Sequence, residues 1–288
     1  MLYSPQGQDF QTVISNVTST RPPATATNFG TAVTVNASTT VYGAWAELIA
    51  GASVTTDIYG ILLNINNYGV SNSNRNALFD IGVDNAGGTT YVTKIPQLMG
   101  GSASPYYLGS GGIWYYFPLY IPAGSSVAVQ AKGTVASTTT GVACWLFGQP
   151  RRPENVRSGS YVDAYGIDNT NNRGTTITIG TTAEGAWTSL GTTTRSYWWQ
   201  QCGFAQNDTS QTAAAIHVDI AAGASTTRNK ILIENQLYII TAAEQISCNP
   251  NFMGSYNNIA SGQIVYGRAQ SSSISDTGPN IACYMVGG

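Results

Sequence analysis

Charged side chains are scarce in this sequence. Only 9% of its 288 residues are Asp, Glu, Lys or Arg, and the formal net charge is −2. Proteins that bind nucleic acid or an anionic membrane normally carry a basic patch. The one basic cluster comprises Arg151, Arg152 and Arg157, in a stretch that also contains Glu154. We therefore expect no nucleic-acid or membrane partner, and we interpret these arginines as residues that form salt bridges or subunit contacts.

Histidine and cysteine are also scarce, which limits metal chemistry. The chain has 1 His and 4 Cys, and no Cys-x-x-Cys or Cys/His spacing typical of zinc sites is present. Cys144 and Cys283 occupy the same place in two similar apolar runs, where cysteine behaves as a small buried hydrophobic residue. We expect free thiols and no metal or other cofactor.

Long hydrophobic runs are missing as well. The most apolar stretch, from Ile113 to Ile121, is too short to span a bilayer and contains Pro118. The first ten residues lack the basic and apolar regions of a secretory signal. We therefore expect a soluble protein made in a cytoplasm. The Asn-x-Ser/Thr triplets then carry little weight as glycosylation sites; they begin at Asn16, Asn36 and Asn207.

Aromatic residues, in contrast, are frequent. The 17 Tyr, 6 Trp and 7 Phe would be missing from a disordered polar chain. Apolar residues alternate with polar ones in stretches such as 31–36 and 175–179, and no segment shows a convincing helical period. Composition and alternation together predict an ordered all-β protein.

Two parts of the chain repeat each other. The tripeptide Gly43-Ala-Trp45 recurs as Gly185-Ala-Trp187, 142 residues later (185 − 43). A closing phrase, a turn and two strands that end near Cys144, recurs near Cys283, 139 residues later (283 − 144). Similar spacings indicate an internal duplication, and we expect each closing phrase to form a hairpin. With about eight strands per copy, the predicted fold is two tandem antiparallel β-sandwiches, jelly-roll-like, with an extended N-terminal arm.

The predicted organisation has four segments. They are an extended N-terminal arm at 1–29, a first sandwich at 30–149, a linker at 150–173 and a second sandwich at 174–288. The linker resembles the arm in length and polarity, so the duplicated unit is arm plus sandwich. We expect the arm to dock on a neighbouring subunit, with contacts from Tyr3, Phe10 and Arg21.

Catalytic candidates are few. Asp80 and Asp84 share one face of a predicted strand and could form an acid/base pair or half of a calcium site. Only Asp80 has a plausible counterpart, Asp219, and no flanking acidic cluster supplies further ligands, so we interpret them as turn or surface carboxylates. His217 could be a general base, but no nucleophile motif accompanies it, and we interpret it as a packing residue. We predict no catalytic residues and no enzymatic activity.

The aromatic clusters are the best functional candidates. Trp114 and Tyr115 belong to one, and Tyr197, Trp198 and Trp199 to the other. Aromatic rings stack on sugars and also anchor protein interfaces. Consecutive residues of a strand point to opposite faces, so some of these rings are core and others are exposed or covered by a partner. The clusters occupy different strands in the two copies, which favours core or subunit contacts over a duplicated sugar site.

Three stretches resemble virion structural proteins of tailed bacteriophages. They are Thr31-Ala-Val-Thr-Val35, Gly43-Ala-Trp-Ala-Glu-Leu48 and Tyr116-Phe-Pro-Leu-Tyr-Ile-Pro-Ala-Gly124. The second copy departs from this style, with Ile259-Ala-Ser-Gly262 in place of the Ile-Pro-Ala-Gly form. The resemblance implies β-sandwich or jelly-roll modules assembled into heads, necks, tails or fibres, and it supplies no catalytic residues.

The leading hypothesis is a bacteriophage virion structural protein. Because long helices are absent, we favour a homo-oligomeric capsid decoration or cement protein over the usual shell protein. It would stabilise the head by contacts with the major capsid protein, or bind tail or neck components. The alternative is a glycan-binding tail, baseplate or fibre-associated host-recognition protein that uses Tyr197 to Trp199, or Trp114 and Tyr115. A polysaccharide-degrading enzyme, with two carboxyl groups across a cleft, is the least favoured hypothesis.

Overall fold

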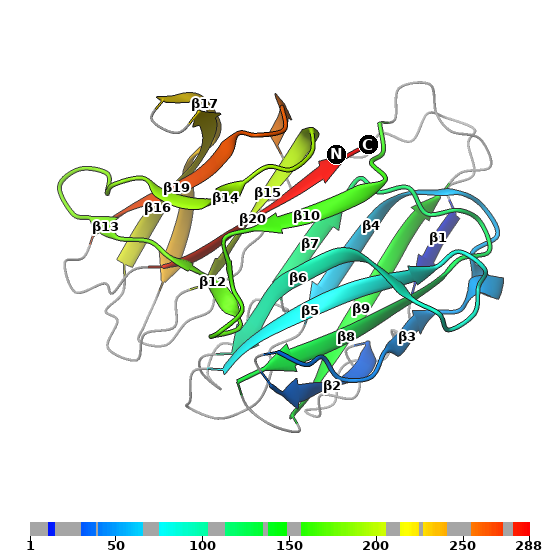
Figure 1. Ribbon diagram of the computed structural model, residues 1–288. Coiled ribbons are helices and arrows are strands. Elements are labelled where there is room, and N and C mark those ends of the chain that lie inside the picture. Colours follow the sequence, from blue (N-terminus) through cyan, green and yellow to red (C-terminus); the bar gives the residue numbers. More distant parts are fainter. Residues whose placement is uncertain are drawn as a thin grey trace.

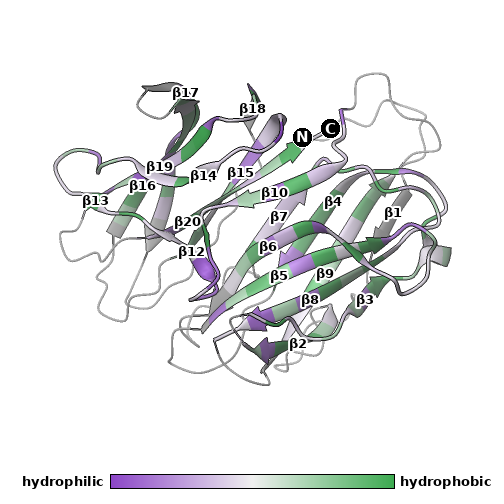
Figure 2. Ribbon diagram, viewed as in Figure 1, coloured by the Kyte–Doolittle hydropathy of each residue, from purple (hydrophilic) through white to green (hydrophobic). Residues whose placement is uncertain are grey.

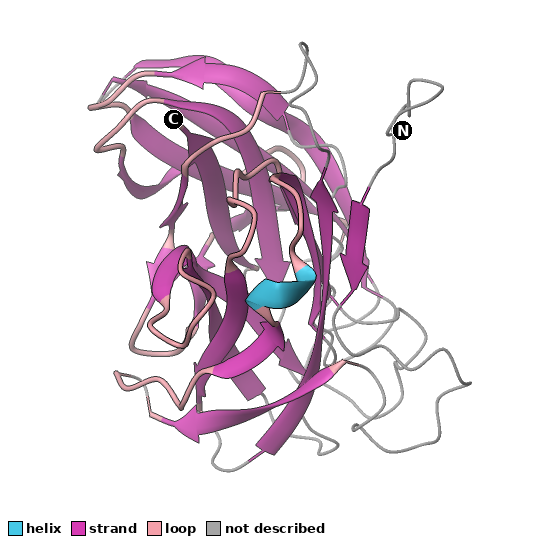
Figure 3. Ribbon diagram, turned by 90° about the vertical axis from the view of Figure 1, so that its right-hand side faces the viewer, coloured by secondary structure: helices cyan, strands magenta, loops and turns pink. Residues whose placement is uncertain are grey.

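The computed structural model consists almost entirely of β-strands (Figure 1). It describes residues 11–14, 30–38, 40–65, 75–102, 113–134, 138–148, 157–205, 214–224, 227–240, 255–272 and 279–288. One short 3-10 turn, Gly51–Ser53, interrupts the strands of the described part and is visible in Figure 3. The all-β prediction is confirmed. None of the described helical segments is long and apolar enough to cross a membrane.

The first sandwich has the strand order of a jelly roll. Its strands are β1 Gln11–Ile14, β2 Thr31–Ala37, β3 Ala46–Ile49, β4 Ile58–Ile65, β5 Arg75–Asp84, β6 Val92–Ser102, β7 Ile113–Phe117, β8 Ser126–Gly133 and β9 Thr138–Gly148. One sheet runs β2-β9-β4-β7 and the other β3-β8-β5-β6. β2 leaves the first sheet at its end and pairs in parallel with β8, which joins the two sheets. Two facing four-stranded sheets in this order define a jelly roll.

The second sandwich repeats this order. Its strands are β10 Tyr161–Tyr165, β11 Ile167–Asp168, β12 Arg173–Thr176, β13 Ile179–Gly180, β14 Thr188–Thr192, β15 Tyr197–Ala205, β16 Ala214–Ala224, β17 Thr227–Ile240, β18 Ser255–Ile259, β19 Ile264–Ser271 and β20 Asn280–Gly287. Its sheets run β12-β20-β15-β18 and β14-β19-β16-β17, with β13 parallel to β19 as β2 is to β8. The predicted internal duplication of a jelly-roll-like sandwich is therefore confirmed.

The repeated closing phrase is not a hairpin, contrary to expectation. β8 pairs with β3 and β5, whereas β9 pairs with β4 and β2, so the two strands of the phrase lie in opposite sheets. The same holds for β19 and β20. The phrase crosses from one layer of the sandwich to the other because each of its strands finds its main partners far away in the sequence.

The arm and the linker contribute equivalent strands. β1 pairs with β9, with Gln11 opposite Gly148, and β10 pairs with β20, with Tyr161 opposite Gly287. Residues 11–14 of the predicted arm thus belong to a sheet of their own chain. The arm residues Tyr3, Phe10 and Arg21 lie outside the described residues. The boundaries of the four predicted segments stay a prediction.

The two sandwiches share part of their core. Alternating positions of β7, namely Ile113, Tyr115 and Phe117, are buried in the core, and hydrophobic residues colour much of the strands in Figure 2. One cluster of buried side chains contains most of the first sandwich's core together with Trp199 and Tyr284 of the second. β10 lies beside β6 at this contact (Figure 1). The halves therefore pack against each other through apolar surface.

Candidate functional site at the contact between the sandwiches

The carboxylates that could have been catalytic hold the backbone of two bulges. Asp80 accepts a hydrogen bond from the N–H of Gln97 at 2.8 Å, and Asp219 accepts one from the N–H of Asn235 at 2.6 Å. Gln97 and Asn235 have positive φ values of 55° and 52°, which non-glycine residues rarely adopt. Both carboxylates are buried, so each satisfies an N–H group that the neighbouring strand does not reach.

Asp84 stabilises a turn. Its two carboxylate oxygens accept hydrogen bonds from the N–H groups of Ala86 and Thr90, each at 2.9 Å. These bonds lower the pKa of the Asp84 carboxyl below its ordinary value. Asp84 thus fits its interpretation as a turn or surface carboxylate, whereas Asp80 is a buried carboxylate at a bulge and does not.

His217 is exposed on β16, so its interpretation as a packing residue is wrong. It lies between Leu237 of β17 and Gln270 of β19. The equivalent residue beside the Asp80 bulge, Leu78, is fully buried. Among the described residues no group of three or more His, Cys, Asp or Glu side chains is arranged to hold a metal ion.

Arg268 forms the most extensive ion-pair cluster in the described ranges. Its Nε lies 2.9 Å and its Nη2 lies 2.7 Å from Oδ2 of Asp219, and Nη2 also contacts Glu184. Its guanidinium lies 4.3 Å from the ring centroid of Trp187. Burial, and then the neighbouring Asp219, raise the pKa of Glu184. The cluster connects the β16 bulge to the segment before β14, so its role is structural.

Most of the predicted aromatic site residues lie inside the molecule. Those exposed by 2% or less are Tyr115, Tyr197, Trp198 and Trp199. Trp114 is half-buried on the outer face of the β4-β7-β9 sheet, where it stacks on Trp145 with ring centroids 5.2 Å apart. Four of the five rings are therefore covered within one chain.

The centre of the contact between the sandwiches is Tyr284 of β20. Its hydroxyl accepts a hydrogen bond from the N–H of Met99 at 2.8 Å and donates one to the carbonyl of Gln97 at 3.0 Å. Its ring meets Tyr115 edge to face at 5.5 Å, and Phe117 at 6.2 Å. A side chain of the second sandwich thus closes the edge strand β6 of the first. We call the contact of Met99, Tyr115 and Phe117 with Trp199 and Tyr284 the seam.

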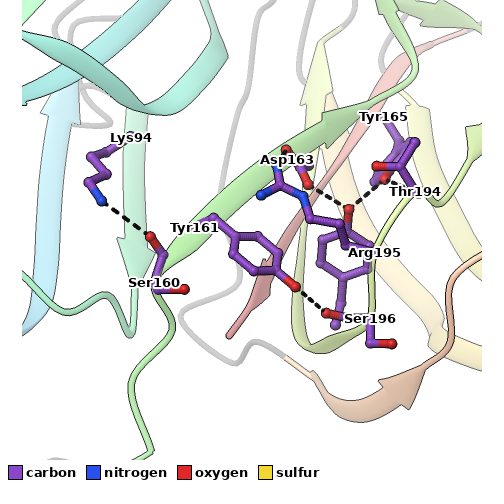
Figure 4. A network of polar contacts seen from close by, with 9 residues as sticks. Lys94, Ser160, Tyr161, Asp163, Tyr165, Thr194, Arg195 and Ser196 are labelled. Atoms are coloured by element: carbon purple, nitrogen blue, oxygen red, sulfur yellow. Dashed lines mark hydrogen bonds and ion pairs between the residues drawn. The ribbon is translucent and has the colours of Figure 1, made fainter.

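A polar network borders the seam (Figure 4). Arg195 lies 4.0 Å from the ring centroid of Tyr161 and donates a hydrogen bond to Asp163 at 2.8 Å. Tyr197 donates to the other oxygen of Asp163 at 2.5 Å, and its hydroxyl lies 2.7 Å from that of Tyr165. Burial, together with the hydrogen bond to Asp163, raises the pKa of Tyr197. The network fixes β10 on the turn that precedes β15.

Two grooves flank Tyr161. The first has a volume of 580 Å³; its lining includes Arg157, Tyr161, Ser196, Trp198 and Asn258. The second, of 510 Å³, lies between β6 and β10; its lining includes Lys94, whose Nζ donates to the carbonyl of Ser160 at 3.4 Å. A guanidinium group covers an aromatic ring face in each groove. In the first groove Arg157 lies 4.6 Å from the ring centroid of Trp198, and in the second Arg195 lies over the ring of Tyr161. The predicted contact residues Arg151 and Arg152 lie outside the described residues.

Sequence reasoning missed the residues that join the sandwiches. Tyr284 follows Cys283 in the closing phrase, at the place where the first copy has Trp145 after Cys144. Two large aromatic residues at one repeated outward-facing position were the available signal. No sequence signal pointed to Asp163 and Arg195, because these two residues meet only when the linker folds as a strand.

Comparison with known proteins assigns no family. No protein-family model matches the chain, and no curated protein matches it. The CBM22-1-CBM22-2 tandem domain of Paenibacillus barcinonensis Xyn10C aligns with 95% of this chain and 89% of its own, at 10% identity and a TM-score of 0.25.

Two structures of infectious bursal disease virus align still more weakly. The Gx strain matches at 11% identity and a TM-score of 0.21, over 85% of this chain and 58% of its own. The T13 viral particle matches at 11% identity and a TM-score of 0.19, over 98% and 70%. The jelly-roll assignment therefore rests on the strand order.

Proposed function

We propose that this chain is a structural protein of a bacteriophage virion, of the capsid decoration or cement type, which acts through contacts with other virion proteins. The observation that carries the proposal is the seam, because it joins two jelly rolls into one body. Tyr284 binds the edge of β6 with two hydrogen bonds, and Tyr115 and Phe117 pack on its ring. A rigid two-lobed body suits a particle component that must keep its shape under load.

The surface chemistry supports the same proposal. With 9% charged residues and a net charge of −2, copies of the chain repel one another weakly and tolerate close packing. A surface rich in Thr, Asn and Tyr carries few charged side chains. When another protein covers it, few charged groups lose their hydration, so the desolvation cost of the contact is low. Burial of such surface between shell subunits is the proposed mode of action.

We further propose that the chain has no enzymatic activity. The carboxylates with a plausible chemical role hold backbone N–H groups instead, Asp80 and Asp219 at the bulges and Asp84 at its turn. Asp219 is in addition paired with Arg268. Removing any of these carboxylates should therefore lower the free energy of unfolding and abolish no catalytic step.

Particle binding by truncated chains tests the proposal. The full chain should remain with purified virions through a density gradient and be present in a fixed ratio to the shell protein. Deletion of residues 1–10 removes Tyr3 and Phe10 but keeps β1, so it should reduce occupancy without changing the unfolding midpoint. Deletion of residues 1–25 should abolish attachment. Absence of the full chain from virions would refute the role, and normal occupancy by both truncated chains would refute only the contribution of the arm.

Glycan binding is a second candidate, and the groove beside Tyr161 is the observation in its favour. Arg157, Ser196 and Asn258 supply polar groups there next to aromatic side chains, a combination that suits sugars. Trp198→Ala is a poor test because that ring is buried, whereas Asn258→Ala changes an exposed residue. A glycan array on which the full chain binds and Asn258→Ala does not would support this function. No binding by the full chain removes it.

A further inference from the structure

The seam joins two different surfaces, and the duplication supplies each of them twice. The first sandwich contributes an edge surface, the free side of β6 around Gln97 and Met99. The second contributes a plug surface, the outer face of β20 and β15 with Tyr284 and Trp199. A chain of two equivalent sandwiches therefore has one further edge surface, on the second sandwich, and one further plug surface, on the first.

The bulges locate the second edge surface. Asn235 occupies the place of Gln97. Each of these two residues has a positive φ, and the backbone N–H of each donates a hydrogen bond to the carboxylate at a bulge. Met99 follows Gln97 by two residues, and Leu237 follows Asn235 by two (237 − 235). Met99 is 2% exposed in the seam, whereas Leu237 is 45% exposed, as is Ile231 on the same strand. The second edge surface thus presents apolar side chains to solvent.

The cysteines locate the second plug surface. Cys144 lies opposite Leu63 in the first sandwich, as Cys283 lies opposite Cys202 in the second. Trp145 therefore occupies the place of Tyr284 and Phe147 that of Val286, whereas Gly60 stands in the place of Trp199. Trp145, Phe147 and their neighbour Leu62 are half-buried. Their counterparts Tyr284 and Val286, by contrast, are fully buried, in the cluster that contains most of the first sandwich's core.

We propose that this protein associates with itself head to tail, the plug surface of one molecule's first sandwich docking on the edge surface of another molecule's second sandwich. Trp145 then contacts Leu237 as Tyr284 contacts Met99 within the chain, and Phe147 and Ile231 extend the apolar contact. Apolar side chains of one molecule then meet apolar side chains of the other. Because the two surfaces differ, the contact is heterologous and generates a ring or an open filament rather than a two-fold dimer. The proposal rests on the repeat and not on a virion role.

Sedimentation velocity on the purified full chain tests this proposal. Species of more than two copies of the 30.3 kDa chain should appear as concentration rises. Leu237→Glu places a charge in the contact and should raise the dissociation constant at least about tenfold. Val41→Glu is the matched control, because Val41 is 58% exposed and lies outside both surfaces. A chain that stays monomeric, a dimer that does not grow, or equal behaviour of the two variants would overturn the proposal.

Mixing variants tests the direction of docking. Leu237→Glu keeps the plug surface and Trp145→Ala keeps the edge surface, so each is expected to be monomeric alone and the mixture to give a one-to-one dimer and nothing larger. Phe147→Ala replaces Trp145→Ala if the latter has a lowered unfolding midpoint. No dimer in the mixture, or growth beyond a dimer, contradicts the head-to-tail contact.

Discussion

Replacing Tyr284 by Phe removes one hydroxyl from the seam and keeps the ring. The N–H of Met99 then loses its acceptor and the carbonyl of Gln97 loses its donor. Tyr284 is 0% exposed and Met99 2%, so water does not replace the hydroxyl. An unsatisfied buried donor costs about 1–3 kcal/mol and a lost hydrogen bond about 0.5–1.5 kcal/mol. We expect Tyr284→Phe to lower the free energy of unfolding by about 2–4 kcal/mol.

Denaturant unfolding followed by tryptophan fluorescence measures this loss. Tyr91→Phe is the control, because the Tyr91 hydroxyl donates to Glu47 at 3.3 Å on the exposed surface, and its removal should cost no more than about 0.5 kcal/mol. The full chain should unfold in one transition, since the sandwiches share a core. Equal losses in the two variants, or two independent transitions in the full chain, would refute the structural role of the seam.

Three further predictions concern the buried ionisable groups. Asp219→Ala leaves Arg268 without its buried partner and the Asn235 N–H without an acceptor. It should lower the free energy of unfolding, measured by thermal or chemical denaturation, by about 3–5 kcal/mol. A loss below about 1 kcal/mol would contradict a structural role of the Arg268 cluster. The folded-state pKa of Asp84 is lowered, so its contribution to stability is present above its ordinary pKa of 3.8 and is lost as pH falls through the folded value; Asp84→Asn should flatten that acid-side loss in unfolding measured across this range. Burial raises the pKa of Cys202 to about 12, so its thiol should react with a thiol reagent at pH 8 only after unfolding, and rapid labelling of the folded chain at this residue would contradict its burial.

The sequence predicted the architecture well, because the repeat and the period of two are local signals. Gly124 and Gly262, which end the turns of the two closing phrases, both have φ of 82°, a value that favours glycine. Gly43 and Gly185 of the repeated Gly-Ala-Trp donate equivalent 2.9 Å hydrogen bonds to Ala131 and Ala269. Local conformations of this kind favour glycine, so they can be recognised in the sequence.

Pairing and burial depended on distant residues and were harder to predict. The closing phrase looked like a hairpin because its two strands are adjacent in sequence, yet β8 and β9 find their main partners in opposite sheets. Trp145 and Tyr284 are equivalent in the repeat, but only Tyr284 is buried by the other sandwich. His217 is exposed although its counterpart Leu78 is buried, because the strand of His217 faces no second sandwich in the described part of the chain.

Imaging of purified virions tests the central proposal most directly. Electron cryomicroscopy should show two-lobed density, each lobe the size of one jelly roll, at regular positions on particles that contain the chain. The same density should be missing from particles assembled without it, which should also break at lower temperature. Particles of identical density and stability with and without the chain would contradict a structural role on the virion.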